Sequence, residues 1–404
     1  KDFLLKISCK LRQDIEFHAG IITAEMGKPI RESRLEVEKC AWLCDYYANN
    51  SIRYLKNKTI KTEASLSYLS YEPLGVILGV MPWNFPYWQV FRFIIPSLMA
   101  GNACILKHAS NVSGCALAIE KIIKEVSPNK NIFNVLLIKS SSVQAVIKNR
   151  FVKAVTITGS EFAGSRVAMA AGKEIKKTLL ELGGSDPFIV LSDANLDICS
   201  KAAVLSRFLN AGQSCIAAKR FIVNYDVYDQ FVGKVLNEIK KLKVGDPAFN
   251  DTHIGPLAKK EFVNDLDVMV QESIKQGAKL LHGGKVDGCY YEPTLLIDVD
   301  KKMDVFRKEV FGPVLCVIKS KNDDHALELA NDTIYGLSSS VWTESKDKAK
   351  IFSRKINSGA VFVNSISKSD PRLPFGGINK SGYGRELSEL GLKEFVNVKT
   401  VVVR

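Results

Sequence analysis

No apolar run in the sequence is long enough to cross a bilayer. The candidates GVILGVM and FIIPSLMA are interrupted by Gly or Pro and fall short of the roughly 20 residues that a spanning helix needs. No signal peptide is recognisable. Because the chain opens without Met inside an amphipathic helical pattern, we expect that a segment preceding Lys1 is missing. The sequence predicts a soluble globular protein.

Histidine is scarce, and no metal-binding motif is present. The five histidines are dispersed and form no HExxH pair. Cys40 and Cys44 would share a helix face, but no further ligand follows at metal-binding spacing, which favours core packing. Nine cysteines at irregular spacing favour a reducing compartment over a disulfide framework. We therefore expect no bound metal and a cytoplasmic protein.

Polybasic tails are also lacking, although the net charge is +13. The lysines are scattered through ordinary amphipathic segments, which is typical of a solvated basic surface. Such a surface favours an anionic small molecule, such as a dinucleotide, over nucleic acid or a membrane.

Alternation of short apolar strands with amphipathic helices dominates the chain from Gly75 onward. The alternation predicts parallel sheets that helices cover on both faces, with ligands at the carboxyl ends of the strands. Residues 57–72 alternate Thr, Ser, Tyr and Lys, as in a hairpin with one wet face. The strand at residues 395–404 could pair with this hairpin, in the same chain or in another subunit.

One cysteine, Cys215, lies in a short polar loop instead of an apolar run. A thiol reacts as thiolate, which requires partial exposure and nearby amides or positive charge. Gly212 permits a close approach of backbone amides, and Lys219 and Arg220 add cationic character. Cys215 is therefore a candidate nucleophile, and the alternative is a buried cysteine that acts as a small hydrophobe.

A glycine turn at Thr158-Gly159-Ser160 links a strand to a helix and could bind phosphate with its free amides. It lacks the GxGxxG and GK[ST] spacings, so an ordinary turn remains an equal alternative. Lys107 closes the strand that begins at Ala103 and would point to ribose or phosphate oxygens, unless it is only an edge lysine.

Two further polar residues stand in apolar surroundings. Glu181 lies between leucines and before two glycines, where burial would raise its pKa toward that of a general base. A structural ion pair is the alternative. Asn84 is bracketed by Trp83 and Phe85 and could hold an oxyanion with its amide, unless it is only a turn residue.

The order and spacing of several strings resemble the aldehyde dehydrogenase superfamily, and the resemblance covers essentially the whole chain. The strings are MPWNFP, ILKHAS, TITGSEFAG, LLELGGSDPFIV, GQSCIAAKR, KEVFGPV and PFGGINKSGYGRE. Within the superfamily the sequence is most similar to microbial succinate semialdehyde dehydrogenases. The resemblance implies NAD(P)-dependent oxidation of a small aldehyde to an acid through a cysteine thioester.

The resemblance also implies residue roles. Cys215 would be the nucleophile and Glu181 the general base, and Asn84 with the Cys215 backbone N–H would form the oxyanion hole. The residues implied in cofactor binding are Trp83, Lys107, Ser110, Gly159, Ser160, Gly164, Glu309 and Phe311.

Three positions bear on cofactor and substrate choice. Many NAD-preferring relatives carry a glutamate where this sequence has Ser110, so we favour NADP, with NAD also accepted. Arg92 falls where the resembling enzymes grip a substrate carboxylate, although it could be a helix-surface arginine. Asp370 stands where those enzymes tend to have serine, and its charge could disfavour a dicarboxylic product, which leaves glyceraldehyde or another short aldehyde as an alternative.

The resulting fold prediction is α/β: a Rossmann-like cofactor domain, a second α/β catalytic domain on parallel sheets, and a small β oligomerisation flap. The predicted divisions are residues 1–56 and 73–184 for the cofactor domain, 185–374 for the catalytic domain, 57–72 and 395–404 for the flap, and 375–394 for a loop returning to the cofactor domain. The flap favours a homodimer or homotetramer. A CoA-acylating relative and a non-catalytic binding protein are disfavoured, because neither would need Glu181 in its motif.

Overall fold

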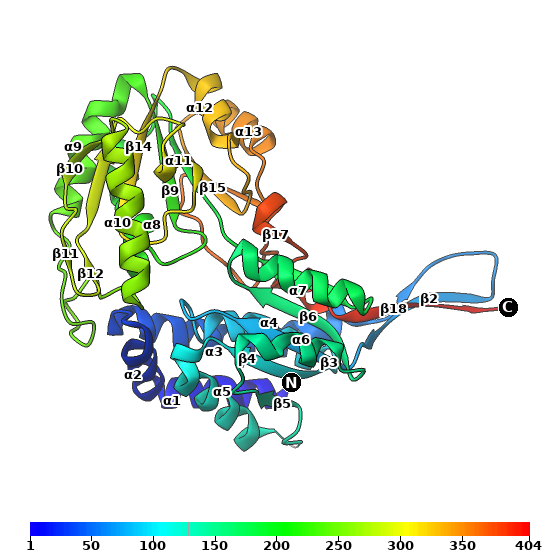
Figure 1. Ribbon diagram of the computed structural model, residues 1–404. Helices are drawn as coiled ribbons and strands as arrows, with labels where there is room; N and C mark the ends of the chain where they lie inside the picture. Colours follow the sequence, from blue (N-terminus) through cyan, green and yellow to red (C-terminus); the bar gives the residue numbers. More distant parts are fainter. Residues whose placement is uncertain (128) are drawn as a thin grey trace.

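The computed structural model describes residues 1–127 and 129–404. Two α/β lobes and a slender arm that ends at the C-terminus make up the molecule (Figure 1). Each lobe is built on one predominantly parallel sheet covered by helices, so the predicted α/β class is confirmed.

The first lobe contains a six-stranded sheet of order β17-β7-β6-β3-β4-β5. Its strands are β3 (Val76–Met81), β4 (Ala103–His108), β5 (Phe133–Val135), β6 (Val152–Thr158), β7 (Lys177–Glu181) and β17 (Gly382–Tyr383). All of them pair in parallel except β17, which is antiparallel to β7.

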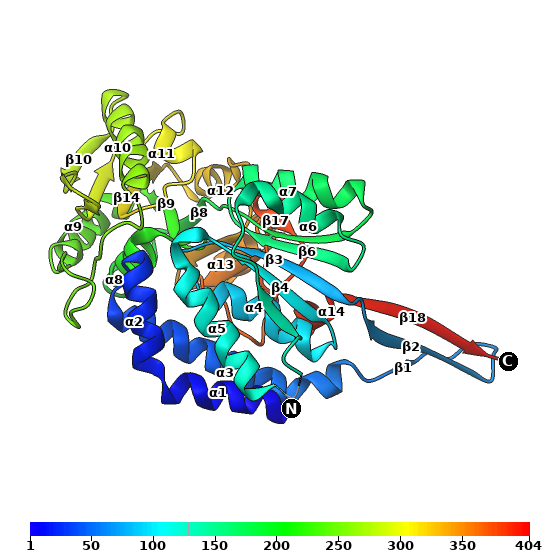
Figure 2. The ribbon, with the colours of Figure 1, turned by 60° about the horizontal axis from the view of Figure 1, so that its bottom comes forward.

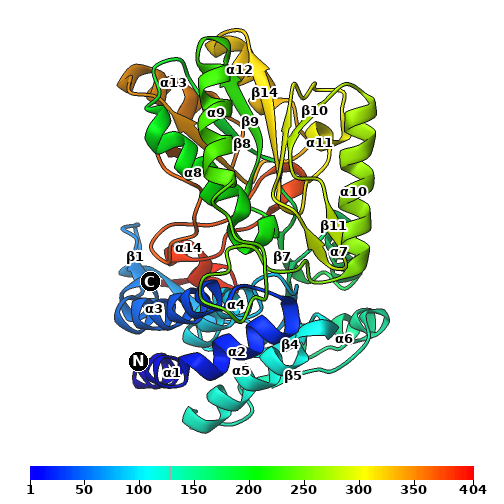
Figure 3. The ribbon, with the colours of Figure 1, turned by 90° about the vertical axis from the view of Figure 1, so that its left-hand side faces the viewer.

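Helices cover this sheet in two shells. Those that contact the strands are α4 (Trp88–Met99), α5 (Ser113–Val126), α6 (Val143–Lys148) and α7 (Glu161–Lys173). Those packed outside α4 and α5 are α1 (Asp2–Gln13), α2 (Ile15–Met26) and α3 (Ile30–Tyr54), seen at the base of the molecule in Figure 3. The strands have mainly apolar sequences because helices bury both faces of the sheet.

The second lobe contains a seven-stranded sheet of order β10-β13-β14-β9-β8-β15-β16. Its strands are β8 (Asp186–Val190), β9 (Ala218–Asn224), β10 (Lys279–His282), β13 (Thr294–Ile297), β14 (Val314–Ser320), β15 (Ser338–Trp342) and β16 (Ala360–Val363). Only β10 runs antiparallel to its neighbour. The helices of this lobe are α8 (Leu196–Phe208), α9 (Tyr228–Ile239), α10 (Lys260–Lys275), α11 (Asp304–Arg307), α12 (Asp323–Asn331) and α13 (Lys346–Lys355).

Smaller elements connect these parts. A separate hairpin pairs β11 (Val286–Asp287) with β12 (Tyr290–Tyr291). The single-turn segments are η1 (Ser110–Val112), η2 (Ser140–Ser142), η3 (Leu209–Gly212), η4 (Tyr225–Val227) and η5 (Asn379–Ser381). The sequence predicted a loop over residues 375–394, but this stretch contains η5, β17 and α14 (Ser388–Lys393), because its backbone pairs with β7 and its helix packs on α3 and α4.

The arm is a three-stranded antiparallel sheet that projects from the first lobe (Figure 2). It consists of β1 (Lys58–Thr59), β2 (Leu66–Pro73) and β18 (Val396–Val403). β18 pairs with β2 along its full length, from Val396 opposite Pro73 to Val403 opposite Leu66. The strand that the hairpin needed is thus supplied by the same chain.

Gly79 lets α4 lie close to the first sheet. A Cβ at this position of β3 would lie 2.4 Å from the Phe93 ring on α4. The β3–α4 connection carries Trp83 and Asn84, so the close approach of helix and strand also fixes where these two side chains lie.

We expect Gly79→Ala to lower the thermal unfolding midpoint, because the added methyl group overpacks the β3–α4 contact at a cost of about 1–3 kcal/mol. Gly172→Ala is the matched control, since Gly172 lies in α7 with nothing within 4 Å of its would-be Cβ. The control should leave the midpoint unchanged or raise it, because Ala favours helix. Equal midpoints for both variants would contradict the packing role of Gly79.

Candidate active site

The loop that carries Cys215 follows α8 through a backbone reversal at η3. Asn210, Ala211 and Gly212 have φ angles of 53°, 52° and 73°. Left-handed backbone is tolerated by Asn and Gly but costs energy for Ala. The Asn210 side chain offsets part of this cost, since its Nδ2 donates to the backbone oxygens of Asn84 at 2.8 Å and Gln213 at 3.2 Å.

A fully buried arginine, Arg207, holds this loop against the loop that follows Glu309. Its guanidinium donates to the carbonyl oxygens of Gly212 at 2.6 Å, Ala218 at 2.9 Å and Gly312 at 2.8 Å. The sequence did not reveal this role, because an arginine in an amphipathic helix is usually solvated. Its partners are backbone carbonyl oxygens, which every residue has and which no sequence pattern marks.

Cys215 lines two cavities. The Trp83 cavity, of about 340 Å³, is lined by residues that include Trp83, Asn84, Ser160, Cys215, Glu309 and Phe311. The Trp88 cavity, of about 220 Å³, is lined by residues that include Lys39, Trp88, Gln89, Arg92, Cys215 and Phe375. Seven of the predicted site residues therefore share a cavity with Cys215: Trp83, Asn84, Gly159, Ser160, Glu309 and Phe311 in the first, and Arg92 in the second.

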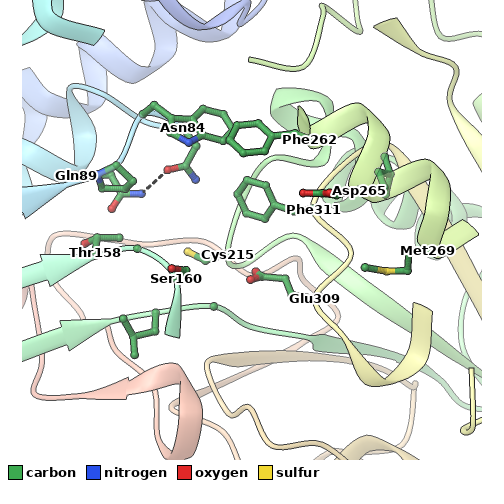
Figure 4. A pocket seen from close by; sticks show the side chains of 16 residues that line it. Asn84, Gln89, Thr158, Ser160, Cys215, Phe262, Asp265, Met269, Glu309 and Phe311 are labelled. Atoms are coloured by element: carbon green, nitrogen blue, oxygen red, sulfur yellow. Dashed lines mark hydrogen bonds between the residues drawn. The ribbon is translucent and has the colours of Figure 1, made fainter. Parts of the chain in front are cut away.

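Aromatic side chains form part of the Trp83 cavity wall (Figure 4). Trp83 stacks on Phe262 of α10 with ring centres 5.0 Å apart, and meets Phe311 edge to face at 5.9 Å. The sequence predicted Trp83 and Phe311 as site residues and missed Phe262, whose position in an amphipathic helix gives no distinguishing signal.

Two neighbours, Gln89 and Gln213, hold the Asn84 side-chain amide. Its Oδ1 accepts a hydrogen bond from Nε2 of Gln89 at 3.1 Å, the dashed line in Figure 4, and its Nδ2 donates to the Gln213 carbonyl at 3.0 Å. An amide nitrogen carries two hydrogens, so one remains for a ligand in the cavity. Gln89 is a positioning residue that the sequence reasoning missed.

Lys219 lies behind the nucleophile loop and is fully buried. Its Nζ donates to the carbonyl oxygens of Ser214 at 2.9 Å and Cys215 at 2.5 Å, and lies 3.2 Å from Oε1 of Glu309. The same Glu309 oxygen accepts the Gly184 backbone N–H at 3.1 Å. One lysine thus links the cysteine loop to the carboxylate across the Trp83 cavity.

Burial raises the pKa of the Cys215 thiol to about 12, while the positive charges of Arg92 and Lys219 act in the opposite direction. Carboxylates of Glu181 and Glu309 add to the increase. The thiol is therefore mainly protonated at neutral pH.

Glu181 ends β7 beside the C-terminal loop and is absent from the linings of both Cys215 cavities. A Cβ on Gly376 would lie 2.8 Å from its Oε1, which has no hydrogen-bond partner in the described part of the chain. Burial, and then the negative charge of Glu386, raise its pKa well above the usual value, against the opposing charges of Arg92 and Arg385.

Arg92 lines the Trp88 cavity, but its positive charge is already paired with a carboxylate of the same chain. Its Nε lies 2.7 Å from Oε2 of Glu386, its Nη2 donates to Gln89 at 3.3 Å, and its guanidinium sits over the Phe375 ring at 4.5 Å. Arg92 is buried, so the alternative of a helix-surface arginine is wrong. The partner Glu386 lies far along the chain and was not predicted.

Asp370 does not line either Cys215 cavity; it borders a separate one with Pro374 and Phe375. Its carboxylate accepts hydrogen bonds from the Arg372 side chain at 2.8 and 2.6 Å, and these bonds hold its pKa below the usual value. The expected effect of an uncompensated negative charge on the substrate is therefore wrong, because Arg372 neutralises it.

Lys107 and Ser110 meet in a third cavity, the Lys107 cavity, of about 400 Å³. Lys139 and Ser140 line it as well, and Nζ of Lys107 lies 3.4 Å from the Ser140 hydroxyl. Burial lowers the pKa of Lys107. Among the described residues that line this cavity there is no carboxylate, so its charge favours an anionic ligand.

The glycine turn before α7 borders the Trp83 cavity with Gly159 and Ser160. Ser160 caps the helix by accepting the Ala163 N–H at 3.3 Å. Gly164 lies inside α7 and not in the turn, and a Cβ there would be 2.5 Å from Cδ2 of Leu182. Gly164 is therefore needed for helix packing, a correction to its predicted place at the turn.

Within residues 1–127 and 129–404, no three His, Cys, Asp or Glu side chains converge as metal ligands. No helix in the same part of the chain has the length and apolar character that a membrane span requires.

A thiol between two cavities on the carboxyl edges of parallel sheets, with an aromatic and carboxylate-bearing wall on one side, is typical of the dinucleotide-dependent oxidoreductases that act through cysteine. The chain belongs to the aldehyde dehydrogenase family, whose model matches residues 1–401. The predicted family and enzyme class, an oxidoreductase acting on aldehydes, are confirmed.

Relatives and solved structures agree with this assignment. A probable NADP-dependent succinate-semialdehyde dehydrogenase of Synechocystis sp. is 48% identical over 402 residues, covering 99% of this chain and 88% of the relative. A succinate semialdehyde dehydrogenase [NAD(P)+] of Escherichia coli strain K12 is 44% identical over 401 residues, 98% of this chain and 87% of the relative. The crystal structure of succinic semialdehyde dehydrogenase from Streptococcus pyogenes with NADP+ superposes with a TM-score of 0.97 at 38% identity, covering 99% and 89% of the two chains.

Lys219→Met should slow the alkylation of Cys215 by iodoacetamide at pH 8. The rate is measured by mass spectrometry of the peptide that contains Cys215. The substitution removes a charge that lowers the thiol pKa, and each unit of increase cuts the thiolate fraction about tenfold. In the wild type, alkylation should keep rising with pH up to about 10 without a plateau.

Lys380→Met, which removes an exposed lysine paired with Glu161, is the matched control and should leave the rate unchanged. The exposed Cys9 serves as an internal standard for general thiol accessibility. An unaltered Cys215 rate in Lys219→Met would show that Lys219 does not act on the thiol.

Proposed function

We propose that this protein oxidises succinate semialdehyde to succinate, with NADP as the preferred acceptor and NAD also accepted. The observation that carries the proposal is the position of Cys215 at the junction of the Trp83 and Trp88 cavities. A thiol there can contact an aldehyde that enters from one side and a nicotinamide that lies on the other. The names of the relatives support this choice of substrate and acceptor.

The residues around the first-lobe sheet edge fit a dinucleotide. Lys107 and Ser110 would bind the adenosine ribose and a 2′-phosphate, since Ser110 offers a hydroxyl where a carboxylate would repel the phosphate. The amides at the start of α7, with Gly159 and Ser160, suit the pyrophosphate. Glu309, Phe311 and Trp83 would hold the nicotinamide ribose and ring, and when bound the nicotinamide accepts the hydride.

The first step is attack by Cys215 on the aldehyde, and the surrounding residues support it. The thiolate adds to the aldehyde carbon, and the resulting oxyanion meets the free N–H of the Asn84 amide and the Cys215 backbone N–H. Gln89 and Gln213 keep the Asn84 amide in place before the charge develops. Loss of one such donor typically costs about 100- to 1,000-fold in rate.

Release of the acid is the second task. After hydride loss a thioester joins the substrate to Cys215, and water must be deprotonated to hydrolyse it. Glu181 has the raised pKa of a general base, but its carboxyl lies beside Gly376 and Glu386. We infer that its side chain turns from this position toward Cys215 when the thioester is present.

The Trp88 cavity is proposed as the aldehyde site. Arg92 lines this cavity, and we propose that it contacts a substrate carboxylate, as the sequence predicted. The ion pair with Glu386 compensates part of the Arg92 charge. Asp370, neutralised by Arg372, is not an obstacle to a dicarboxylic product.

At the level of the whole molecule, we propose residues 1–56 and 73–184 as the cofactor domain and 185–374 as the catalytic domain. Exposed valines on β18, including Val398 and Val402, support the proposal that the arm contacts other copies in a homodimer or homotetramer. Nine free cysteines support a reducing compartment, the cytoplasm.

Glu181→Gln should retain the first turnover and lose the following ones. We expect a burst of reduced cofactor of up to one equivalent per active site, then a steady state that is at least about 100-fold slower than in the wild type. Because the Glu181 pKa is raised, the wild-type steady-state rate should increase as pH rises through its ionisation, and this increase should vanish in Glu181→Gln.

Stopped-flow absorbance at 340 nm measures both phases. Glu174→Gln, at an exposed position after α7, is the control and should behave as the wild type. A burst-free loss of all activity would assign Glu181 to the acylation step instead.

An aldehyde panel with both cofactors tests the proposed function directly. We expect the highest kcat/KM for succinate semialdehyde with NADP, a lower value with NAD, and no activity in Cys215→Ala. A preference for glyceraldehyde or another uncharged short aldehyde, or a higher kcat/KM with NAD, would overturn the corresponding part of the proposal.

A further inference from the structure

Besides Arg92, the Trp88 cavity contains a half-buried cation, Lys39, that forms no ion pair with a carboxylate in the described part of the chain. Lys39 lies on α3 and lines the cavity together with Cys215 and Arg92. Within the described part of the chain, no carboxylate oxygen lies within 4.0 Å of its Nζ, whereas Arg92 has Glu386 at 2.7 Å. Of these two cations, Lys39 therefore has the charge that is less compensated.

Neighbouring polar groups hold the Lys39 ammonium in a fixed place. Its Nζ donates to the Ser369 hydroxyl oxygen at 2.8 Å, and the same oxygen accepts the Trp88 indole N–H at 3.0 Å. The ammonium also lies 4.4 Å from the centre of the Trp88 ring, within range of a cation–π contact. Two of its N–H groups remain for another acceptor.

The acidic side chains on the same face of α3 are engaged elsewhere. Glu36 accepts the backbone N–H groups of Tyr87 and Trp88 at 2.9 Å each and pairs with the buried Lys28. Glu32 accepts the Asn210 N–H at 2.7 Å, and burial raises its pKa to about 7. Neither carboxylate forms a direct ion pair with Lys39.

Desolvation, followed by the nearby charge of Arg92, lowers the pKa of Lys39 to about 8, although the charges of Glu36 and Asp370 act in the opposite direction. Burial is costly for an ammonium that has no direct ion pair. A carboxylate that enters the cavity would gain a charge-assisted hydrogen bond from this ammonium.

We propose that Lys39 binds the distal carboxylate of the aldehyde substrate and so selects ω-carboxylated aldehydes over uncharged ones. The inference rests on the proposed function and names a specificity residue for it. Lys39 and Cys215 line the same cavity, so one short substrate could place its carboxylate at the first and its aldehyde carbon at the second.

The test compares kcat/KM for succinate semialdehyde and for butanal, which has the same chain length without the carboxylate. In Lys39→Met we expect a loss of roughly 10- to 100-fold for succinate semialdehyde, the range of a charged hydrogen bond. Butanal should change by less than about threefold. Lys39→Arg should recover part of the loss, because the cation is restored.

Lys173→Met is the matched control. Lys173 is an exposed lysine at the end of α7 and lines neither Cys215 cavity, so its removal should leave kcat/KM for both substrates unchanged. A parallel loss for both aldehydes in Lys39→Met, or an unchanged preference, would overturn the role of Lys39.

A binding measurement separates this role from folding and from turnover. Succinate should protect Cys215 from iodoacetamide in the wild type and in Lys173→Met, but at least about tenfold more weakly in Lys39→Met. Equal protection would overturn the inference. Failure of the proposed function is distinguishable, because the wild type itself would then show no preference for succinate semialdehyde over butanal.

Discussion

The nucleophile loop depends on buried cations that hold backbone carbonyls. Arg207 binds four carbonyl oxygens, those of Gly212, Ala218, Val310 and Gly312, and Lys219 binds the carbonyl oxygens of Ser214 and Cys215. Buried carbonyls without partners would each cost about 1–3 kcal/mol, so these two side chains allow a strained, left-handed turn to persist in the interior. Their charges also bear on what the loop can do, since Lys219 opposes the rise in the thiol pKa that burial causes.

Charge compensation explains much of the remaining site. Carboxylates and cations lie close together around Cys215, with the buried Glu181 and Glu386 near Arg92, and the half-buried Glu309 near Lys219. In such an environment the protonation of one group depends on its neighbours, because little water screens them. A ligand that brings its own negative charge therefore changes the electrostatics of the reacting thiol as well as filling space.

Contiguous motifs made the fold and the reactive loop predictable. Alternating strands and helices gave the α/β class, and the glycine turn at Gly159 and the strings around Asn84 and Cys215 depend on local backbone geometry. Pairs that form across long separations left no such trace. Arg92 with Glu386 joins residues that are remote in sequence, and Gly164 serves a helix contact with Leu182 that no local pattern specifies. The effect of the Asp370 charge was misjudged. The sequence contains Arg372, but it does not show that the Arg372 guanidinium is oriented toward the Asp370 carboxylate.

The order of the strands along the chain means that the two sheets become complete at different stages of synthesis. The first sheet draws strands from residues 76–181 and then β17 at Gly382–Tyr383, and the arm closes only with β18 at Val396–Val403. All strands of the second sheet lie between Asp186 and Val363. On a ribosome, the second lobe therefore has its complete sheet available while the first still exposes the edge of β7, which includes Glu181. Pairing at that edge, and with it the surroundings of the proposed base, is completed only after all strands of the second sheet have emerged.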